Sequence, residues 1–211
     1  QMVDSPTNNF ATMNPLDESG VTLSEGNLQA SVDVTGNRVV ASTFSPSTGK
    51  WYVEMFANSF VADAAGIGVC GLPYTSDTSL PYIYSDSVMY YANSGAKYID
   101  GTSSSYGSSF TAGDIIGLAI DLDGNSITFY KNNVSQGAIS KTFTGGYTIV
   151  LPNFTATAGR IQVYKMNFGQ DSSFAGAKTA QGNQDGNGIG DFYYTPPTGF
   201  LALCTSNLPD V

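Results

Sequence analysis

The side chains that carry most hydrolytic chemistry are scarce in this 211-residue chain, which contains 17 acidic residues, 8 basic residues and no histidine. Without an imidazole, neither a Ser-His-Asp triad nor a Cys-His pair can be assembled, and zinc sites lose their commonest ligand. Hydrolysis by those routes is therefore excluded. We expect a protein that is not an enzyme and has no catalytic residue.

A pair of carboxylates is the remaining route to hydrolysis, because glycosidases place two of them across a cleft. The glutamates are Glu18, Glu25 and Glu54, and no Glu-x-Asp-x-x-Glu strand pattern occurs. Asp121 and Asp123 flank an Asp-Gly-Asn turn, where aspartate is favoured for its local hydrogen bonds. We interpret this pair as structural, and an enzyme with two aspartates at hydrolytic separation stays as an alternative.

The stretch NQDGNGIGD, residues 183–191, partly resembles a calcium-binding loop. Asp185, Asn187 and Asp191 carry oxygen atoms, and Gly188 stands in the sixth place. Tyr194 occupies the position of the bidentate glutamate, so affinity for calcium should be poor. We interpret the stretch as a glycine-permitted turn, keep these three residues as metal candidates, and expect no cofactor.

The net charge of −9 indicates which partners to exclude. Phosphate backbones and anionic membrane surfaces would be repelled, so we expect no nucleic-acid partner. No apolar run reaches the ~18 residues that span a bilayer, and the first ten residues lack the regions of a signal peptide, so no membrane insertion is expected. The start at Gln1 and the ending CTSNLPDV suggest a module cut from a longer protein.

The two cysteines, Cys70 and Cys204, each stand in an apolar run. A scaffold held by disulfides would carry more cysteines. We expect buried free thiols, with a disulfide between the two as the alternative.

Strand signals dominate the chain, and sustained helical periodicity appears nowhere. GKWYVEMFA, residues 49–57, alternates with the period of a half-buried strand, and Trp51 is expected to anchor the core. AAGIGVCGL, residues 64–72, is predicted to be a buried strand where backbones approach closely. Residues 1–20 are expected to be an extended lead-in, and residues 21–33 an edge hairpin.

The longest alternating segment is GDIIGLAIDLDGNSITFYKNNVSQG, residues 113–137, with Asp-Gly-Asn at its first bend. One face of the first strand is predicted to carry Ile116, Leu118 and Ile120. The opposite face is predicted to carry Ile115, Gly117, Ala119 and Asp121. The Asp-Gly signal fixes the register of a β-hairpin, and a second turn follows at 132–133. Short strands separated by turn signals favour a two-sheet sandwich.

Tyrosine-rich loops are the predicted binding surface. The polar stretch 73–87 contains several tyrosines, and long irregular loops between strands commonly bind ligands. Tyrosine offers a broad, rather rigid contact area with a hydroxyl, which suits recognition of protein or sugar. Recognition is assigned to the loops 72–87, 93–110 and 132–137. The candidate ligand-binding residues are Tyr74, Tyr82, Tyr84, Tyr106, Asn93, Lys97, Asn132 and Asn133.

The order GKWYVEM, GIGVC, the 113–137 segment and MNFGQ resembles the SPRY (B30.2-like) family over about residues 49–170. The resemblance implies an all-β fold, a bent antiparallel sandwich of two sheets of the concanavalin-like jelly-roll type, that binds partners through loops at one end. It predicts an N-terminal extension with edge strands at 1–48, a sandwich core at 49–170, and a Gly/Asn-rich loop with a completing C-terminal strand at 171–211.

The flanks DSPTNNFATMNPLD and NQDGNGIGDFYYTPPTGFLALCTSNLP resemble segments that bracket SPRY-like domains in structural or tail-fibre proteins of bacteriophages. This context implies a binding or structural module on the surface of a phage particle, in a fibre, tail or capsid. Its partners would be a protein or host glycan bound by the loops, other virion proteins and a second copy in a homo-oligomer. A lectin-like module or a purely architectural domain is the alternative.

Overall fold

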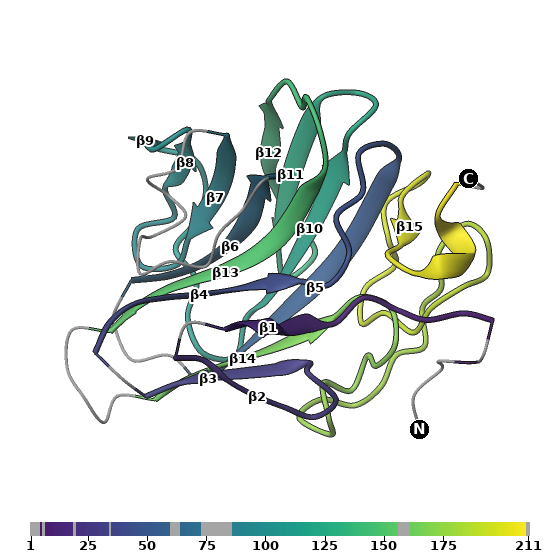
Figure 1. The fold of residues 1–211 in the computed structure, drawn as a ribbon, viewed down its shortest axis with the longest axis horizontal. Coiled ribbons are helices and arrows are strands. Elements are labelled where there is room, and N and C mark those ends of the chain that lie inside the picture. Colours follow the sequence, from purple (N-terminus) through teal and green to yellow (C-terminus); the bar gives the residue numbers. More distant parts are fainter. Residues whose placement is uncertain are drawn as a thin grey trace.

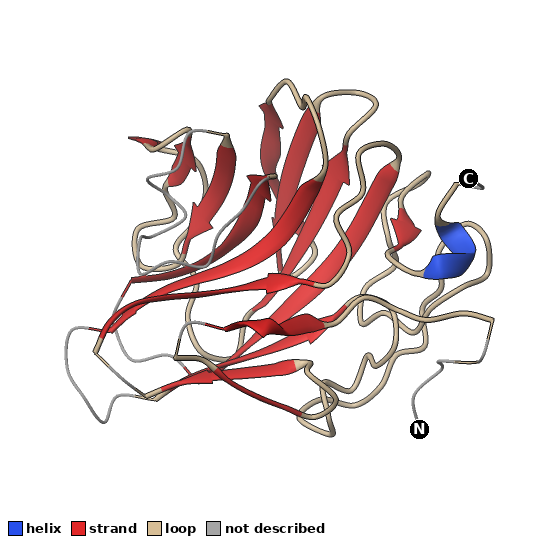
Figure 2. Ribbon diagram, viewed as in Figure 1, coloured by secondary structure: helices blue, strands red, loops and turns tan. Residues whose placement is uncertain are grey.

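The computed structural model describes residues 5, 7–18, 20–33, 35–59, 64–72, 86–155 and 161–209. They form two sheets packed face to face (Figures 1 and 2). Loops connect the strands, and one short 3₁₀ turn (Thr205–Asn207) follows the last strand. The predicted all-β sandwich is confirmed. No helix among the described residues has the length and apolar character needed to cross a bilayer.

The first sheet has the strand order β1-β4-β13-β6-β7-β8-β9. These strands are β1 (Met13–Glu18), β4 (Gly36–Ser42), β13 (Tyr147–Thr155), β6 (Ala64–Gly71), β7 (Ser87–Tyr91), β8 (Lys97–Ile99) and β9 (Thr102–Ser104).

The second sheet has the order β12-β11-β10-β5-β14-β3-β2, and neighbouring strands in these two orders pair antiparallel. Its strands are β12 (Val134–Ser140), β11 (Ser126–Lys131), β10 (Ile115–Asp121), β5 (Lys50–Ser59), β14 (Gln162–Asn167), β3 (Gln29–Val32) and β2 (Thr22–Ser24). The short strand β15 (Leu201–Ala202) pairs parallel with the start of β5, beyond the point where β14 ends its pairing with β5.

The main core lies between the two sheets. Trp51, Val53 and Met55 point into it from β5, and Ile116, Leu118 and Ile120 from β10. All six side chains are buried. The predicted alternation of residues 113–137 is confirmed, because Ile115 and Ala119 join separate clusters on the opposite face.

Residues 65–70 of strand β6 are buried, as the apolar and glycine-rich sequence of the strand predicts. A Cβ atom at Gly68 would overlap the carbonyl oxygen of Val88 on β7, and one at Gly66 would overlap that of Tyr90. Glycine therefore permits the close approach of these two strands.

Strand β5 is buried on both faces, so the prediction of a half-buried strand is wrong. Tyr52, Glu54 and Phe56 point away from the main core yet are at most 5% exposed. The C-terminal segment from about residue 168 onward covers them, and Figure 1 shows it in yellow-green beside β5 and β14. The ring of Phe192 meets that of Tyr52 edge to face at 5.4 Å.

The flanks of the core contribute strands to both sheets. The lead-in expected at residues 1–20 contains β1, which pairs with β4, and the hairpin expected at 21–33 is the β2–β3 edge. Cys70 and Cys204 are buried free thiols, as expected. Burial raises the pKa of both thiols, so neither is poised as a nucleophile.

Candidate binding surface

Three loops, with the strand residues next to them, meet at one end of the sandwich, which we call the Tyr106 end and define as residues 92–97, 105–114 and 131–137. The amide of Gly107 donates to the carbonyl of Gly95 at 2.9 Å, and that of Phe110 donates to Ala92 at 2.9 Å. The amide of Ser108 donates to the side-chain oxygen of Gln136 at 2.9 Å. These bonds order the three loops as one surface.

Tyr106 fastens this surface to the second sheet. Its hydroxyl accepts a hydrogen bond from the amide of Phe129 at 3.2 Å and donates to the carbonyl of Gly137 at 2.5 Å. The hydroxyl thus joins β11 to β12 at the place where their pairing register is irregular, between Thr128 and Tyr130. Burial raises the pKa of Tyr106, and its hydroxyl has a structural partner on each side. What remains for a partner is the exposed part of its ring.

Asn132 and Asn133 form the two-residue turn between β11 and β12. Their φ angles of 47° and 66° are those of a turn in which both central residues are left-handed, a conformation that asparagine tolerates. Asn132 accepts from the amide of Ile115 at 2.9 Å and donates to Asp114 at 2.7 Å. Both residues are exposed, but the side chain of Asn132 is engaged in these two hydrogen bonds, so that of Asn133 is more open to a partner.

Positive charge gathers at this end of an otherwise acidic chain. The ammonium of Lys97 lies 5.5 Å from the centre of the Tyr106 ring. Lys131 donates to the carbonyl of Ser109 at 2.8 Å and lies 3.3 Å from a carboxylate oxygen of Asp114. Together with the exposed Asn93, these groups present donors on a backbone that is already ordered.

Most of the predicted loop 72–87, including the candidates Tyr74, Tyr82 and Tyr84, lies outside the described residues. Its part in the binding surface stays a prediction. Asn93, Lys97, Tyr106, Asn132 and Asn133 are brought together at the Tyr106 end.

The carboxylates at the β10–β11 turn are structural, as predicted. Asp121 pairs with Lys50 at 2.7 Å and accepts from the amide of Gly124 at 2.6 Å. Asp123 accepts from the amide of Gly49 at 2.8 Å. Desolvation raises the pKa of Asp121, but the hydrogen bond from Lys50 and that from Gly124 outweigh it and lower the pKa below its usual value.

The calcium-like stretch forms a turn around Asp185. One carboxylate oxygen accepts from the amides of Asn187 and Ile189, both at 2.9 Å. The other accepts from the amide of Ala202 at 2.9 Å and the side chain of Asn207 at 2.8 Å. No cluster of three or more potential metal ligands from His, Cys, Asp and Glu forms within the described part of the chain. Metal binding by Asp185, Asn187 and Asp191 remains a prediction.

Glu54 has a role that the sequence alone did not predict, because its carboxylate is fully buried on the outer face of β5. One oxygen accepts from the amide of Tyr194 at 2.8 Å and the hydroxyl of Tyr52 at 3.3 Å. The other accepts from the amide of Tyr193 at 2.8 Å and the side chain of Asn167 at 3.1 Å. Burial raises its pKa to about 7 although these hydrogen bonds lower it. The carboxylate thus holds the C-terminal segment against the sheet.

A signal for this cover was present in the sequence. Tyr52 and Phe56 stand on the same face of the strand as Glu54. Two aromatic side chains on a face assumed to be solvated indicate that another segment packs on it.

Comparison with known proteins assigns the family. The sequence matches the SPRY domain family over residues 49–171, which is more than half of the chain. The chain belongs to the SPRY family. SPRY domains generally act as protein-binding modules, which bind their partners through loops, and not as enzymes.

Solved structures agree on the fold. The SPRY domain of human HERC1 superimposes with a TM-score of 0.64 at 18% identity, covering 73% of this chain and 96% of that one. Stonustoxin superimposes with a TM-score of 0.57 at 19% identity, covering 75% of this chain and 27% of that one.

A curated relative is similar in sequence as well. E3 ubiquitin-protein ligase RKP of Arabidopsis thaliana is 33% identical over 99 residues, or 46% of this chain. The match spans only 7% of the length of that ligase.

Proposed function

We propose that this SPRY domain is a non-enzymatic binding module that recognises a protein partner through the Tyr106 end. The observation that carries the proposal is the ordering of three loops by hydrogen bonds from Gly107, Ser108 and Phe110. Because these loops are already fixed, binding loses little conformational entropy. The exposed Asn93 and the ammonium of Lys97 then supply polar contacts around the ring of Tyr106.

We further propose that the module is carried on the surface of a phage-like particle, as part of a fibre, tail or capsid. The likeness of the flanking segments to those around SPRY-like domains of phage proteins supports this context. Other virion proteins and further copies of the chain would then be its neighbours. Immunogold labelling of particles purified from the source culture should place the chain on the particle, and unlabelled particles would reject this context.

The binding surface is tested with purified chain and host cells. Fluorescently labelled chain should bind the cells, and protease treatment of the cells should abolish binding if the partner is a protein. The double variant N93A/K97A should weaken binding at least about tenfold, as loss of about 1.4 kcal/mol requires. Thr142→Ala, an exposed substitution in the β12–β13 loop at the other end, should leave binding unchanged. Equal binding by both variants would rule out the Tyr106 end.

A host glycan is the second candidate ligand, favoured by the exposed amides of Asn93 and Asn133 at the same end of the sandwich as the half-buried Tyr106. The same chain applied to a glycan array separates the two. Retained binding to protease-treated cells together with a defined array signal would replace the protein partner by a glycan.

A further inference from the structure

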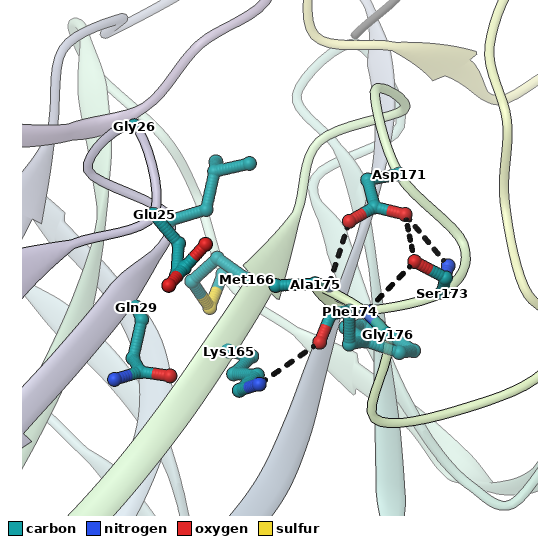
Figure 3. Close-up of a pocket in the computed structure, with 11 residues that line it drawn as sticks. Glu25, Gly26, Gln29, Lys165, Met166, Asp171, Ser173, Phe174, Ala175 and Gly176 are labelled. Atoms are coloured by element: carbon teal, nitrogen blue, oxygen red, sulfur yellow. Dashed lines mark hydrogen bonds between the residues drawn. The ribbon is translucent and has the colours of Figure 1, made fainter. Parts of the chain in front are cut away.

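A cavity of about 480 Å³ opens on a different part of the molecule, between the β2–β3 turn and the loop that follows β14. Figure 3 shows Glu25 and Gln29 along one side, Asp171 and Phe174 along the other, and Met166 between them. The cavity is far in sequence from the loops of the Tyr106 end and shares no lining residue with them.

Both walls of the cavity are built from consecutive left-handed residues. Glu25, Gly26 and Asn27 have φ angles of 53°, 66° and 63°. The opposite wall repeats the pattern, with 50°, 53° and 76° at Phe174, Ala175 and Gly176. For residues other than glycine and asparagine this conformation is strained, by about 1–3 kcal/mol each. Such strain persists where surrounding contacts fix the backbone, and here it gives the opening a defined shape.

The polar side chains of the two walls differ in whether they already have hydrogen-bond partners within the chain. Asp171 accepts from the amide and hydroxyl of Ser173 at 2.8 and 2.6 Å and from the amide of Ala175 at 2.7 Å. Lys165 donates to the carbonyl of Phe174 at 3.1 Å. These groups hold the loop together.

Glu25 and Gln29 are in the opposite situation. Within the described part of the chain, neither side chain has a hydrogen-bond or ion-pair partner. Glu25 is exposed at the rim, and Gln29 is half-buried. Their oxygen atoms are therefore available to a ligand that donates hydrogen bonds.

The charges of the lining select a cation. Glu25 and Asp171 carry two negative charges against the single positive charge of Lys165, whose ammonium already has the carbonyl of Phe174 as a partner. The net charge of −9 of the whole chain adds to the attraction. A planar guanidinium matches a carboxylate in two parallel hydrogen bonds.

We propose that this cavity binds an arginine side chain of a partner protein, with the guanidinium on the carboxylate of Glu25 and beside the side chain of Gln29. The proposal rests on the proposed binding function but uses a second surface. It would allow one partner to contact the domain at two separate places, or two partners to bind at once.

The test is an NMR titration of the ¹⁵N-labelled chain with N-acetyl-L-arginine amide, which presents the side chain as a peptide does. Amide signals of Gly26, Ala175 and Gly176 should shift, with a dissociation constant on the order of millimolar or weaker. The neutral isostere N-acetyl-L-citrulline amide should shift them at least about fivefold less at equal concentration.

Two variants with matched loss of charge complete the test. Glu25→Gln should weaken binding at least about fivefold, whereas Asp33→Asn, at an exposed residue outside the cavity, should change it less than about twofold. Superposition of the remaining amide signals shows that each variant is folded. Absence of shifts at the cavity, equal binding of citrulline, or equal effects of both variants would overturn the proposal. Tighter binding of free L-arginine would reject a partner protein as the source.

These outcomes leave the Tyr106 end unaffected. Loss of arginine binding with intact cell binding rejects only the cavity. Loss of cell binding in N93A/K97A with intact arginine binding supports both surfaces.

Discussion

The two faces of β5 are both buried, but different forces bury them. The inner face presents Trp51, Val53 and Met55 to the main hydrophobic core. The outer face presents Glu54 between Tyr52 and Phe56. Its carboxylate accepts four hydrogen bonds, two of which come from the amides of Tyr193 and Tyr194 in the covering segment. Apolar packing tolerates many partners, whereas these bonds require particular donors at particular places. The inner face therefore supplies stability, and the outer face specifies where the C-terminal segment lies.

The largest expected effect is on the inner face. Trp51→Ala should destabilise the domain by about 3–5 kcal/mol, because it removes a large buried side chain and leaves a cavity. Denaturant unfolding followed by circular dichroism measures the change. A loss below about 1 kcal/mol would mean that the inner face is not the main source of stability.

The outer face should respond to pH. The pKa of Glu54 rises from 4.5 to about 7 on folding, so between these values the native state binds more protons than the unfolded state. Stability from this group is therefore fully present below pH 4.5 and falls as pH rises toward 7, by about 3 kcal/mol. Urea unfolding at pH 5 and pH 8 measures the fall.

Glu54→Gln is the matched control for this pH dependence, since the amide has the same shape and does not titrate. The variant should remove the fall between pH 5 and pH 7. The lowered pKa values of Asp100, Asp121 and Asp171 act with the opposite sign and only below their unfolded value of 3.8, outside this window. A slope that persists in Glu54→Gln would assign the pH dependence to another group.

At the Tyr106 end, as at Glu54, one polar group joins separate segments: the hydroxyl of Tyr106 bonds to Phe129 and to Gly137. Tyr106→Phe should cost about 2 kcal/mol, because it leaves the amide of Phe129 and the carbonyl of Gly137 without this partner. Tyr130→Phe is the control, as the Tyr130 hydroxyl has no hydrogen bond to a described residue. Equal effects of the two changes in thermal unfolding would contradict the role given to Tyr106.

The smallest effect is expected at a position held by neither apolar packing nor a buried bond. Asn133 is exposed with φ of 66°, so Asn133→Ala should cost about 1 kcal/mol through backbone strain alone. Asn133→Gly adopts this φ freely and should be close to neutral. The pair compared by thermal unfolding isolates the backbone contribution, and a neutral alanine variant would show that the turn relaxes.

The sequence was sufficient wherever structure depends on neighbours along the chain. The period of two predicted the faces of Ile115 and Ile116, and the glycines of residues 64–72 predicted the close approach of β6 to β7. The docking of the C-terminal segment was not predictable in this way, because Glu54 and Tyr193 are 139 positions apart.

The candidate site shows the same division between local and distant information. The left-handed turn at Asn132 and Asn133 follows from the residue types, but the insertion of Tyr106 between β11 and β12 depends on a loop more than twenty residues away.

The pairing of the two flanks beside β5 has a mechanical consequence. Phe10 bridges Cys204 antiparallel, the amide of Ala11 donates to Leu203, and that of Thr205 donates to Asn9. Tension applied between residues 9 and 205 therefore loads these bonds one after another, as in opening a zipper, and leaves the strands of the two sheets unloaded at first. Optical-tweezer pulling from these positions should detach the flanks at low force before the sandwich yields, and simultaneous rupture would contradict this order.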